Sequence, residues 1–395
     1  MIPYGKQQIS EQDVAAVIEV LRSDWLTQGP KVPEFEHKIA EYCHAGYAVA
    51  VNSATSALHI ACLALQVGPG DRVWTSPNSF VASANCALYC GASVDFIDID
   101  LQTGNLCVQA LEQKLQQAKQ DGTLPKVVIP VHFAGQSCPM EAIASLADRY
   151  GFAVIEDASH AVGASYQQRP VGDCRYSDIC IFSFHPVKII TSAEGGMALT
   201  NSPQLARTMQ RLRSHGITSI ETEMTEPSHG PWYYQQIGLG FNYRMTDLQA
   251  ALGLSQFTEL TRFVESRNVL ARRYNELCQH IPQLEPLKVQ SDCLSSYHLY
   301  VVLLQQANRQ VQRQLITKLR QLGIMAHLHY IPIHLQPYYQ QLGFQAGQFP
   351  QAENYYQRAI TLPLYPGLTA AEQDLIIESL QACLLAATEQ AGQGL

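Results

Sequence analysis

Short apolar runs alternate with stretches of helical periodicity between residues 48 and 200. Helical stretches lie between several of the runs, for example at residues 56–65 and 140–150. The apolar runs occupy residues 48–51, 72–76, 93–99, 126–133, 152–157, 178–184 and 196–200. Strands buried on both faces of a sheet read as continuous apolar runs, and parallel strands need crossover connections that are usually helical. The pattern therefore predicts an α/β fold with a mostly parallel central sheet covered by helices on both faces.

The rest of the chain follows a different pattern. A long helical stretch with interruptions covers residues 246–281, and the residues after it mix strand and helix. Residues 296–304 are predicted to form a strand. With a length of 395 residues, this change of pattern predicts two domains. We expect a large domain with its N-terminal segment at 1–258 and a smaller C-terminal α/β domain at 259–395.

Composition excludes several classes of function. Lysine and arginine number 26 against 34 acidic residues, which gives a net charge of −8, and no basic run stands out. A nucleic-acid partner or an anionic membrane surface is therefore not expected. No apolar run is long enough to cross a membrane, and the polar N-terminus has no signal-peptide core. The eleven cysteines form no CxxC pair, which favours free thiols in a reducing cytoplasm.

Polar residues that directly follow the apolar runs are the candidates for chemistry, because ligands of open α/β sheets bind beyond the carboxyl ends of the strands. Residues 52–58 follow the first run and open a helix with small hydroxyl side chains. A helix N-terminus suits a phosphate group, although the same residues would also serve as an ordinary helix cap. Ser183, at another strand end, could donate to a phosphate, and Gly195 with Gly196 would allow close backbone approach.

Three further side chains suggest a bound aromatic ring. Asp157 ends a buried strand beside Glu156, where two carboxylates are costly unless they are paired or functional. A carboxylate there could keep a pyridine nitrogen protonated, or it could cap a helix or bridge to an arginine. Lys188 lies between apolar stretches, where desolvation would make it nucleophilic, or it could snorkel to the surface. Phe80 could stack on a planar ring or pack in the core.

The order of these features resembles the DegT/DnrJ/EryC1/StrS family of sugar aminotransferases, and the resemblance covers nearly the whole chain. It implies the fold type I of pyridoxal-phosphate (PLP) dependent transferases, which is the aspartate-aminotransferase-like fold. Lys188, in FSFHPVK, resembles the lysine that forms the Schiff base with PLP. Asp157, in EDASHA, resembles the partner of the pyridine nitrogen. His160 stands where many relatives have glutamine, near the cofactor O3′.

The same resemblance assigns further contacts. Phe80 matches the aromatic side chain that stacks on the ring, and Ala54, Thr55 and Ser183 match the phosphate cradle. Asn242 matches an asparagine that reaches the phosphate of the neighbouring subunit, which implies a homodimer with shared active sites. Substrate-side positions align with Tyr4, Thr27, Gln28, Gly29, His327, His329 and Tyr330. The histidines lack metal-site spacing, so contact with sugar or diphosphate is expected rather than metal, and a core or loop role is also open.

Within the family, several segments resemble the branch that serves pseudaminic acid synthesis. They are residues 2–7, 23–30, 75–96, 155–166, 182–191 and 212–218. Small departures are Ser79 and Ser192, where threonine would be expected. This likeness implies L-glutamate as amino donor and UDP-2-acetamido-2,6-dideoxy-β-L-arabino-hexos-4-ulose as acceptor.

Three alternatives stay open. They are an aminotransferase for another nucleotide-linked keto-sugar, a PLP dehydratase, and a catalytically silent regulator or partner-binding protein. Lys188 opposes the dehydratase, which has histidine at that position. The absence of a basic helix-turn-helix-like segment opposes a DNA-binding regulator.

Overall fold

A seven-stranded sheet forms the centre of the larger part of the molecule in this computed structural model, which describes residues 1–305 and 308–392. Residues 306–307 and 393–395, the latter ending the predicted second domain, lie outside the described residues. The strand order is β1-β9-β8-β5-β4-β2-β3. The strands are β1 (Tyr47–Val51), β2 (Arg72–Thr75), β3 (Ser93–Phe96), β4 (Val127–Ile129), β5 (Ala153–Asp157), β8 (Ile179–Ser183) and β9 (Gly196–Thr200). Each predicted apolar run thus contributes one strand.

The sheet is mostly parallel, as predicted. The pairs β2–β3, β2–β4, β4–β5 and β5–β8 are parallel. β9 runs antiparallel to both of its neighbours, β8 and β1. The segment between β8 and β9 carries Lys188 and contains no helix. A parallel continuation would have needed a long crossover, so β9 returns in the opposite direction.

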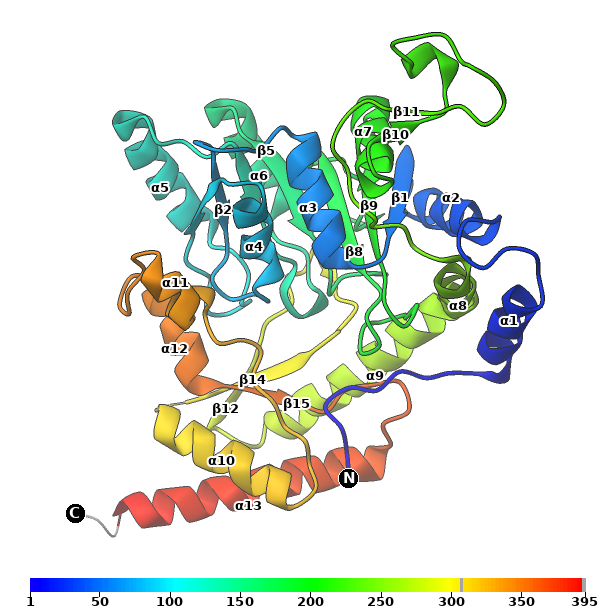
Figure 1. Cartoon of the computed structure of the whole chain (residues 1–395). Coiled ribbons are helices and arrows are strands. Elements are labelled where there is room, and N and C mark those ends of the chain that lie inside the picture. The colour runs from blue at the N-terminus through cyan, green and yellow to red at the C-terminus, as the bar shows by residue number, and fades with distance from the viewer. Residues whose placement is uncertain (306–307, 393–395) are drawn as a thin grey trace.

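Helices cover both faces of this sheet (Figure 1). Alternate strand residues point to opposite faces, so Val49 packs in one core and its neighbours Ala48 and Ala50 in another. The first core contains α3 (Ala54–Ala64), α4 (Ala82–Tyr89) and α7 (Pro203–Arg213). The opposite face is covered by α2 (Lys31–Cys43), α5 (Val108–Asp121) and α6 (Met140–Tyr150). The predicted α/β fold with two covered faces is confirmed.

Two long helices leave the larger part and lead to the smaller one. Within the predicted helical stretch, α8 (Asp247–Thr258) ends and α9 (Leu260–Cys278) begins on either side of Glu259. Thr246 caps α8 in a capping box with Gln249, and α1 (Glu11–Leu21) packs against this helix. The domain boundary between residues 258 and 259 stays a prediction.

The smaller part has its own hydrophobic core and a three-stranded antiparallel sheet in the order β12-β14-β15. Ile2 joins this core from the N-terminus, which crosses the molecule to reach it (Figure 1). The elements here are β12 (Leu284–Pro286), β14 (Tyr300–Leu304), α10 (Arg309–Gln321), α11 (Pro337–Gln341), α12 (Pro350–Arg358), β15 (Ala359–Leu362) and α13 (Ala370–Gly392). Short remaining strands are β6 (Ser165–Tyr166), β7 (Arg169–Pro170), β10 (Ile217–Thr218), β11 (Gln235–Gln236) and β13 (Cys293–Leu294). Short 3-10 turns are η1 (Phe133–Gly135), η2 (Glu221–Glu223) and η3 (Ile333–Leu335).

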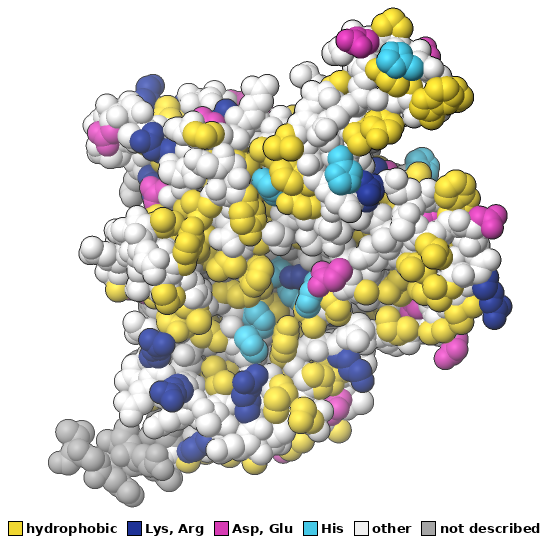
Figure 2. All heavy atoms as spheres, viewed as in Figure 1, with side chains coloured by type: hydrophobic (Ala, Val, Ile, Leu, Met, Phe, Trp, Pro, Cys, Tyr) yellow, Lys and Arg dark blue, Asp and Glu magenta, His cyan; other side chains and the backbone are white. Residues whose placement is uncertain are grey.

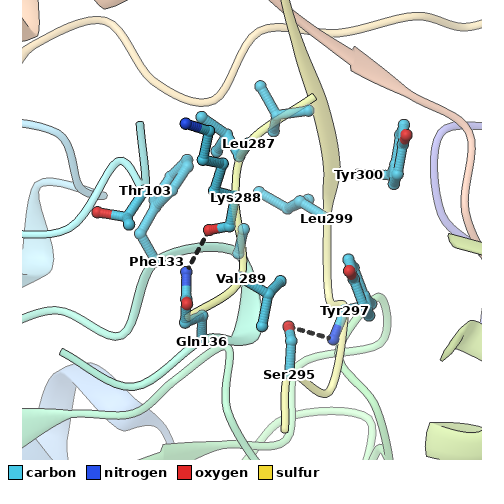
Figure 3. A pocket seen from close by; sticks show the side chains of 12 residues that line it. Thr103, Phe133, Gln136, Leu287, Lys288, Val289, Ser295, Tyr297, Leu299 and Tyr300 are labelled. Carbon is cyan, nitrogen blue, oxygen red and sulfur yellow. Dashed lines mark hydrogen bonds between the residues drawn. The ribbon is translucent and has the colours of Figure 1, made fainter. Parts of the chain in front are cut away.

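The strand predicted at 296–304 is shorter than expected and begins at Tyr300. The preceding residues instead bond to the loop after β4, because the amides of Ser296 and Leu299 donate to the carbonyls of Gly135 and Ala134. Figure 3 shows a small pocket lined by residues of both segments, where the side-chain amide of Gln136 donates to the Lys288 carbonyl at 2.9 Å. These hydrogen bonds replace the sheet pairing of residues 296–299. They join segments far apart in the sequence, so the apolar pattern of residues 296–304 could not reveal them.

Within the described residues, no helix combines the length and the apolar character needed to span a membrane.

Candidate active site

A cavity of about 620 Å³ lies beyond the carboxyl ends of β5 and β8, between the central sheet and the smaller part. Figure 2 shows histidine side chains gathered in this hollow. Of the predicted site residues, the cavity wall contains Tyr4, Ala54, Thr55, Phe80, Asp157, His160, Ser183, Lys188, His327, His329 and Tyr330. Residues from segments up to about three hundred positions apart therefore meet at one site, as expected at the strand ends of an open α/β sheet.

The other four predicted residues lie outside the wall of this cavity. The Thr27 carbonyl accepts from the Asp247 amide, and Gly29 packs beside Trp25. Gln28 lies in the same turn. Asn242 pairs with Ser214 in an isolated bridge. The substrate role of the turn and the reach of Asn242 into a neighbouring subunit stay predictions.

Lys188 projects from the segment between β8 and β9 and lines the cavity. Its amide donates to the His185 carbonyl at 2.9 Å, which fixes the local turn. Desolvation by the surrounding protein lowers the pKa of Lys188 to about 8, and the charge of Asp157 opposes this shift only in part. The unprotonated amine, which a nucleophile or proton acceptor requires, is therefore far more accessible near neutral pH than in an ordinary lysine.

Asp157 is the last residue of β5 and is 4% exposed. Its carboxylate accepts hydrogen bonds from the hydroxyls of Ser83 and Ser159, both at 2.6 Å. These bonds hold the carboxylate at the cavity wall, and no arginine among the described residues bridges to it, so the bridging alternative does not apply there. Sequence reasoning missed both serines, although they lie within the quoted motifs around Phe80 and Asp157.

His160 is fixed in one tautomer. The Ala134 amide donates to its Nδ1 at 3.3 Å, so Nδ1 carries no proton. Burial and the charge of Lys188 hold the pKa of His160 well below its usual value, so the ring is neutral. Its single proton is therefore on Nε2, which donates to the Tyr330 hydroxyl at 3.1 Å. The Tyr330 hydroxyl keeps its own hydrogen for another acceptor at the cavity.

His298 also lines the cavity and was missed by the sequence reasoning. Its ring centroid lies 4.4 Å from that of His160, and burial holds its pKa well below the usual value. The residue sits in an apolar run that reads as a strand, so no local signal marked it. Its presence at the site follows from the bonds that delay the start of β14 to Tyr300.

His327 and His329 form the outer wall together with Tyr4. Their rings stack at 4.6 Å, and Tyr4 lies 5.1 Å from His329. Burial lowers the pKa of His329 to about 3, and its Nδ1 pairs with the Thr361 hydroxyl at 3.0 Å. Over residues 1–305 and 308–392, no group of three or more histidine, cysteine or acidic side chains is arranged to hold a metal ion.

The N-terminus of α3 forms another wall. Ser53 caps the helix by accepting from the Ser56 amide at 3.1 Å, so the ordinary capping interpretation is correct for this residue. Ala54 and Thr55 follow at the cavity, where the first amides of a helix have no helical acceptor. A side chain at Gly196 would overlap the backbone of Ser53 and Ala54. The glycine thus permits the close approach of β9 to this helix start.

Phe80 is 59% exposed, which contradicts a role in the core. Its ring lies 6.4 Å from that of Tyr330 at the cavity. The exposed aromatic face, the helix N-terminus, the held carboxylate and the desolvated lysine are a donor set that fits a phosphorylated pyridine aldehyde. Each of these groups meets a different part of such a ligand.

Comparisons with known proteins agree with this geometry. The SpsC protein of Bacillus subtilis (strain 168), a spore coat polysaccharide biosynthesis protein, is 40% identical over 383 residues, which are 96% of each chain. Helicobacter pylori PseC, an aminotransferase involved in the biosynthesis of pseudoaminic acid, is 32% identical with a TM-score of 0.89, over 98% of this chain and 99% of that chain. Spr1654 of Streptococcus pneumoniae in its PMP form is 30% identical with a TM-score of 0.88, over 97% and 99% of the two chains.

The family match extends over residues 7–381. Similar structures include PLP and PMP forms, which bear the cofactor that the cavity fits. The chain belongs to the DegT/DnrJ/EryC1/StrS aminotransferase family and is a PLP-dependent sugar aminotransferase with the aspartate-aminotransferase-like fold.

Proposed function

We propose that this enzyme transfers the amino group of L-glutamate to C4 of UDP-2-acetamido-2,6-dideoxy-β-L-arabino-hexos-4-ulose. The product is UDP-4-amino-4,6-dideoxy-N-acetyl-β-L-altrosamine, an intermediate of pseudaminic acid biosynthesis. The likeness to Helicobacter pylori PseC over nearly the whole of both chains carries this proposal. The segments at residues 75–96 and 182–191, which resemble the same branch, surround the cavity and support it.

A second candidate is transamination of another nucleotide-linked keto-sugar. The 40% identity to a spore coat polysaccharide protein favours it, because that identity exceeds the 32% to PseC. A panel of UDP- and dTDP-linked keto-sugars, assayed with L-glutamate, separates the two candidates. We expect the highest kcat/KM for the UDP-linked 4-keto L-arabino sugar. A different keto-sugar with a higher kcat/KM would overturn the choice of substrate.

Lys188 and Asp157 would carry the chemistry. When bound, PLP supplies an electron-withdrawing ring that makes the proton on the donor Cα removable. The Lys188 amine takes this proton and later returns a proton to C4 of the acceptor sugar. Asp157, held by Ser83 and Ser159, keeps the ring nitrogen protonated.

The remaining contacts would bind and orient. The start of α3 at Ala54 and Thr55, together with Ser183, would hold the cofactor phosphate. Phe80 would stack on the ring, and His160 would lie near O3′. The sugar nucleotide would contact Tyr4, Thr27, Gln28, Gly29, His327, His329 and Tyr330. The proposal includes a cytoplasmic location, since all eleven cysteines are free thiols, as is usual in a reducing compartment.

The lowered pKa of Lys188 predicts a pH dependence. Below its pKa of about 8 the side chain is a protonated ammonium, and above it a nucleophilic amine. The rate at which the cofactor-free protein takes up PLP should therefore rise with pH and reach half its maximum near pH 8. Stopped-flow absorbance of PLP measures this rate. A midpoint near the ordinary lysine value of 10.5 would contradict the desolvated environment.

The proposal also includes a homodimer. Residues 217–240 form an arm whose strands β10 and β11 lead away from the body of the molecule (Figure 1), and Asn242 follows the arm where it pairs with Ser214. Large apolar side chains are exposed along the arm: Ile220 at 55%, Trp232 at 75%, Tyr234 at 59% and Leu239 at 80%. Such side chains gain most by burial against a second copy. Asn242 would then reach the phosphate in the neighbouring active site.

Charges placed on the arm should separate the dimer. We expect the double variant Trp232→Glu, Leu239→Glu to shift from dimer to monomer in light scattering at micromolar concentration, because burying two carboxylates in an apolar interface is unfavourable. The control is Leu322→Glu, at a 60% exposed position on the smaller part, which should leave the dimer intact. A monomeric parent protein, or a double variant that stays dimeric, would refute this arrangement.

A further inference from the structure

The cavity has to accept two chemically different substrates if the proposed function is correct. L-Glutamate brings two carboxylates, whereas the reacting pyranose ring is uncharged. Among the described residues that line the cavity, Lys188 is the one lysine or arginine, and it is engaged in the chemistry. Asp157 and Glu194 add negative charge to the same wall. The donor carboxylates therefore need a further source of positive potential.

Arg267 of α9 supplies such a potential from behind the cavity wall. It is 1% exposed, and its Nη1 donates to the carbonyls of Tyr297, His298 and Leu364 at 3.1, 3.4 and 3.1 Å. Its Nε has no hydrogen-bond partner, and burial is the one influence on its pKa, with no contribution from an acidic side chain in the described part of the chain. Burial lowers its pKa to about 10, so it stays cationic at neutral pH. A buried cation without a counter-ion is unfavourable, and a nearby anion relieves it.

His298 lies between this charge and the cavity. Its side chain lines the cavity and is 5% exposed, while its backbone carbonyl accepts from Arg267. The buried Nδ1 has no hydrogen-bond partner among the described residues. In contrast, both nitrogens of His160 are engaged, and Nδ1 of His329 pairs with Thr361. Among the five histidines of the wall, His298 is thus the one with a buried ring nitrogen that has no partner among the described residues.

We propose that His298 binds a carboxylate of the amino donor through a ring N–H, and that the buried charge of Arg267 stabilises this contact from behind. The inference rests on the proposed function and explains how one cavity serves both substrates. If an arginine stood in the cavity wall in place of His298, its charge would be left without a partner when the uncharged sugar ring enters. Leaving a buried charged group unpaired is energetically unfavourable. A neutral imidazole can donate to a carboxylate in one half-reaction and to a sugar hydroxyl in the other.

Two substitutions at this position separate a binding role from a structural one. His298→Leu removes the ring N–H, whereas His298→Gln keeps an N–H donor. We expect His298→Leu to raise the KM for L-glutamate roughly 10- to 100-fold, the usual effect of losing a hydrogen bond to a charged group. Its KM for the keto-sugar should change roughly threefold or less, because a neutral hydrogen bond is weaker. His298→Gln should recover most of the loss for L-glutamate.

A binding measurement that needs no turnover completes the test. Glutarate has the two carboxylates of glutamate but no amino group, and calorimetry on the PLP-loaded enzyme gives its Kd. We expect His298→Leu to weaken glutarate binding by about the same factor as it raises the KM for L-glutamate, with His298→Gln close to the parent. A Kd for His298→Leu within roughly twofold of the parent, or equal losses for both substrates, would overturn the assignment.

The outcomes also separate the two proposals. If the parent enzyme transfers no amino group from glutamate to any keto-sugar, the proposed function fails. The glutarate titration then still decides whether His298 is a carboxylate contact. Thermal unfolding and the visible absorbance of bound PLP show whether each variant is folded and loaded. If His298→Leu does not fold, His298→Asn takes its place in the titration, because its N–H lies on a shorter side chain. A higher glutarate Kd in this variant supports the contact, and an unchanged Kd refutes it.

Discussion

Replacing Lys188 by alanine is expected to abolish multiple-turnover transamination, with a fall in kcat of roughly four orders of magnitude or more. On the proposed mechanism, this variant loses both the amine that would attach the cofactor and the base that would move the Cα proton. Alanine adds no bulk, so the cavity keeps its shape. The measurement is steady-state formation of the amino sugar with L-glutamate as donor, together with the visible absorbance of the purified protein.

A second lysine provides the control for this variant. Lys38, on α2, is half exposed, pairs with Glu41 at 3.4 Å and is not part of the cavity wall. Lys38→Ala should keep the parent kcat and the visible band of bound PLP. Full multiple-turnover activity in Lys188→Ala would show that another group carries the chemistry.

Replacing Asp157 by asparagine should lower kcat by roughly 10²- to 10³-fold, the usual loss when a preorganised charge is removed from an active site. Asparagine has nearly the same shape and can still accept hydrogen bonds from Ser83 and Ser159 through its amide oxygen. It lacks the negative charge that would keep the ring nitrogen protonated. The expected result is a large fall in kcat with a smaller change in the KM for either substrate.

Glu156 offers a matched control, because it is the neighbouring carboxylate on the same strand. It points to the other side of the sheet, where it pairs with His132 at 2.6 Å and accepts from Ser177 at 2.5 Å. Glu156→Gln should lower the unfolding temperature and leave kcat within roughly threefold of the parent. Equal losses of kcat in the two variants would mean that Asp157 has only a structural role.

Most of the central sheet could be predicted because its strands are buried on both faces. Burial on both faces removes polar residues from each strand, so every strand shows as one continuous apolar run. The reversed direction of β9 was not predicted, although the short segment around Lys188 leaves no room for a helical crossover. The late start of β14 could not be predicted, since the amides of Ser296 and Leu299 bond to a loop more than a hundred residues away.

The candidate site was predictable to the extent that its residues follow strands. Lys188 and Asp157 stand out because a charged side chain beside an apolar run is unusual. Ser83 and Ser159 are common residues whose role depends on the carboxylate that they contact. His298 looks like one position of a strand, and Arg267 looks like one more charge on a polar helix. Their meeting behind the cavity depends on how the smaller part packs against the sheet.

The most direct test of this account is amino transfer from L-glutamate labelled with heavy nitrogen to UDP-2-acetamido-2,6-dideoxy-β-L-arabino-hexos-4-ulose. Mass spectrometry follows the nucleotide sugar in the presence of the purified, PLP-loaded enzyme. The account predicts a UDP-linked 4-amino sugar that carries the heavy nitrogen, with one 2-oxoglutarate formed for each product. An unchanged keto-sugar after prolonged incubation, with another keto-sugar aminated by the same preparation, would contradict it.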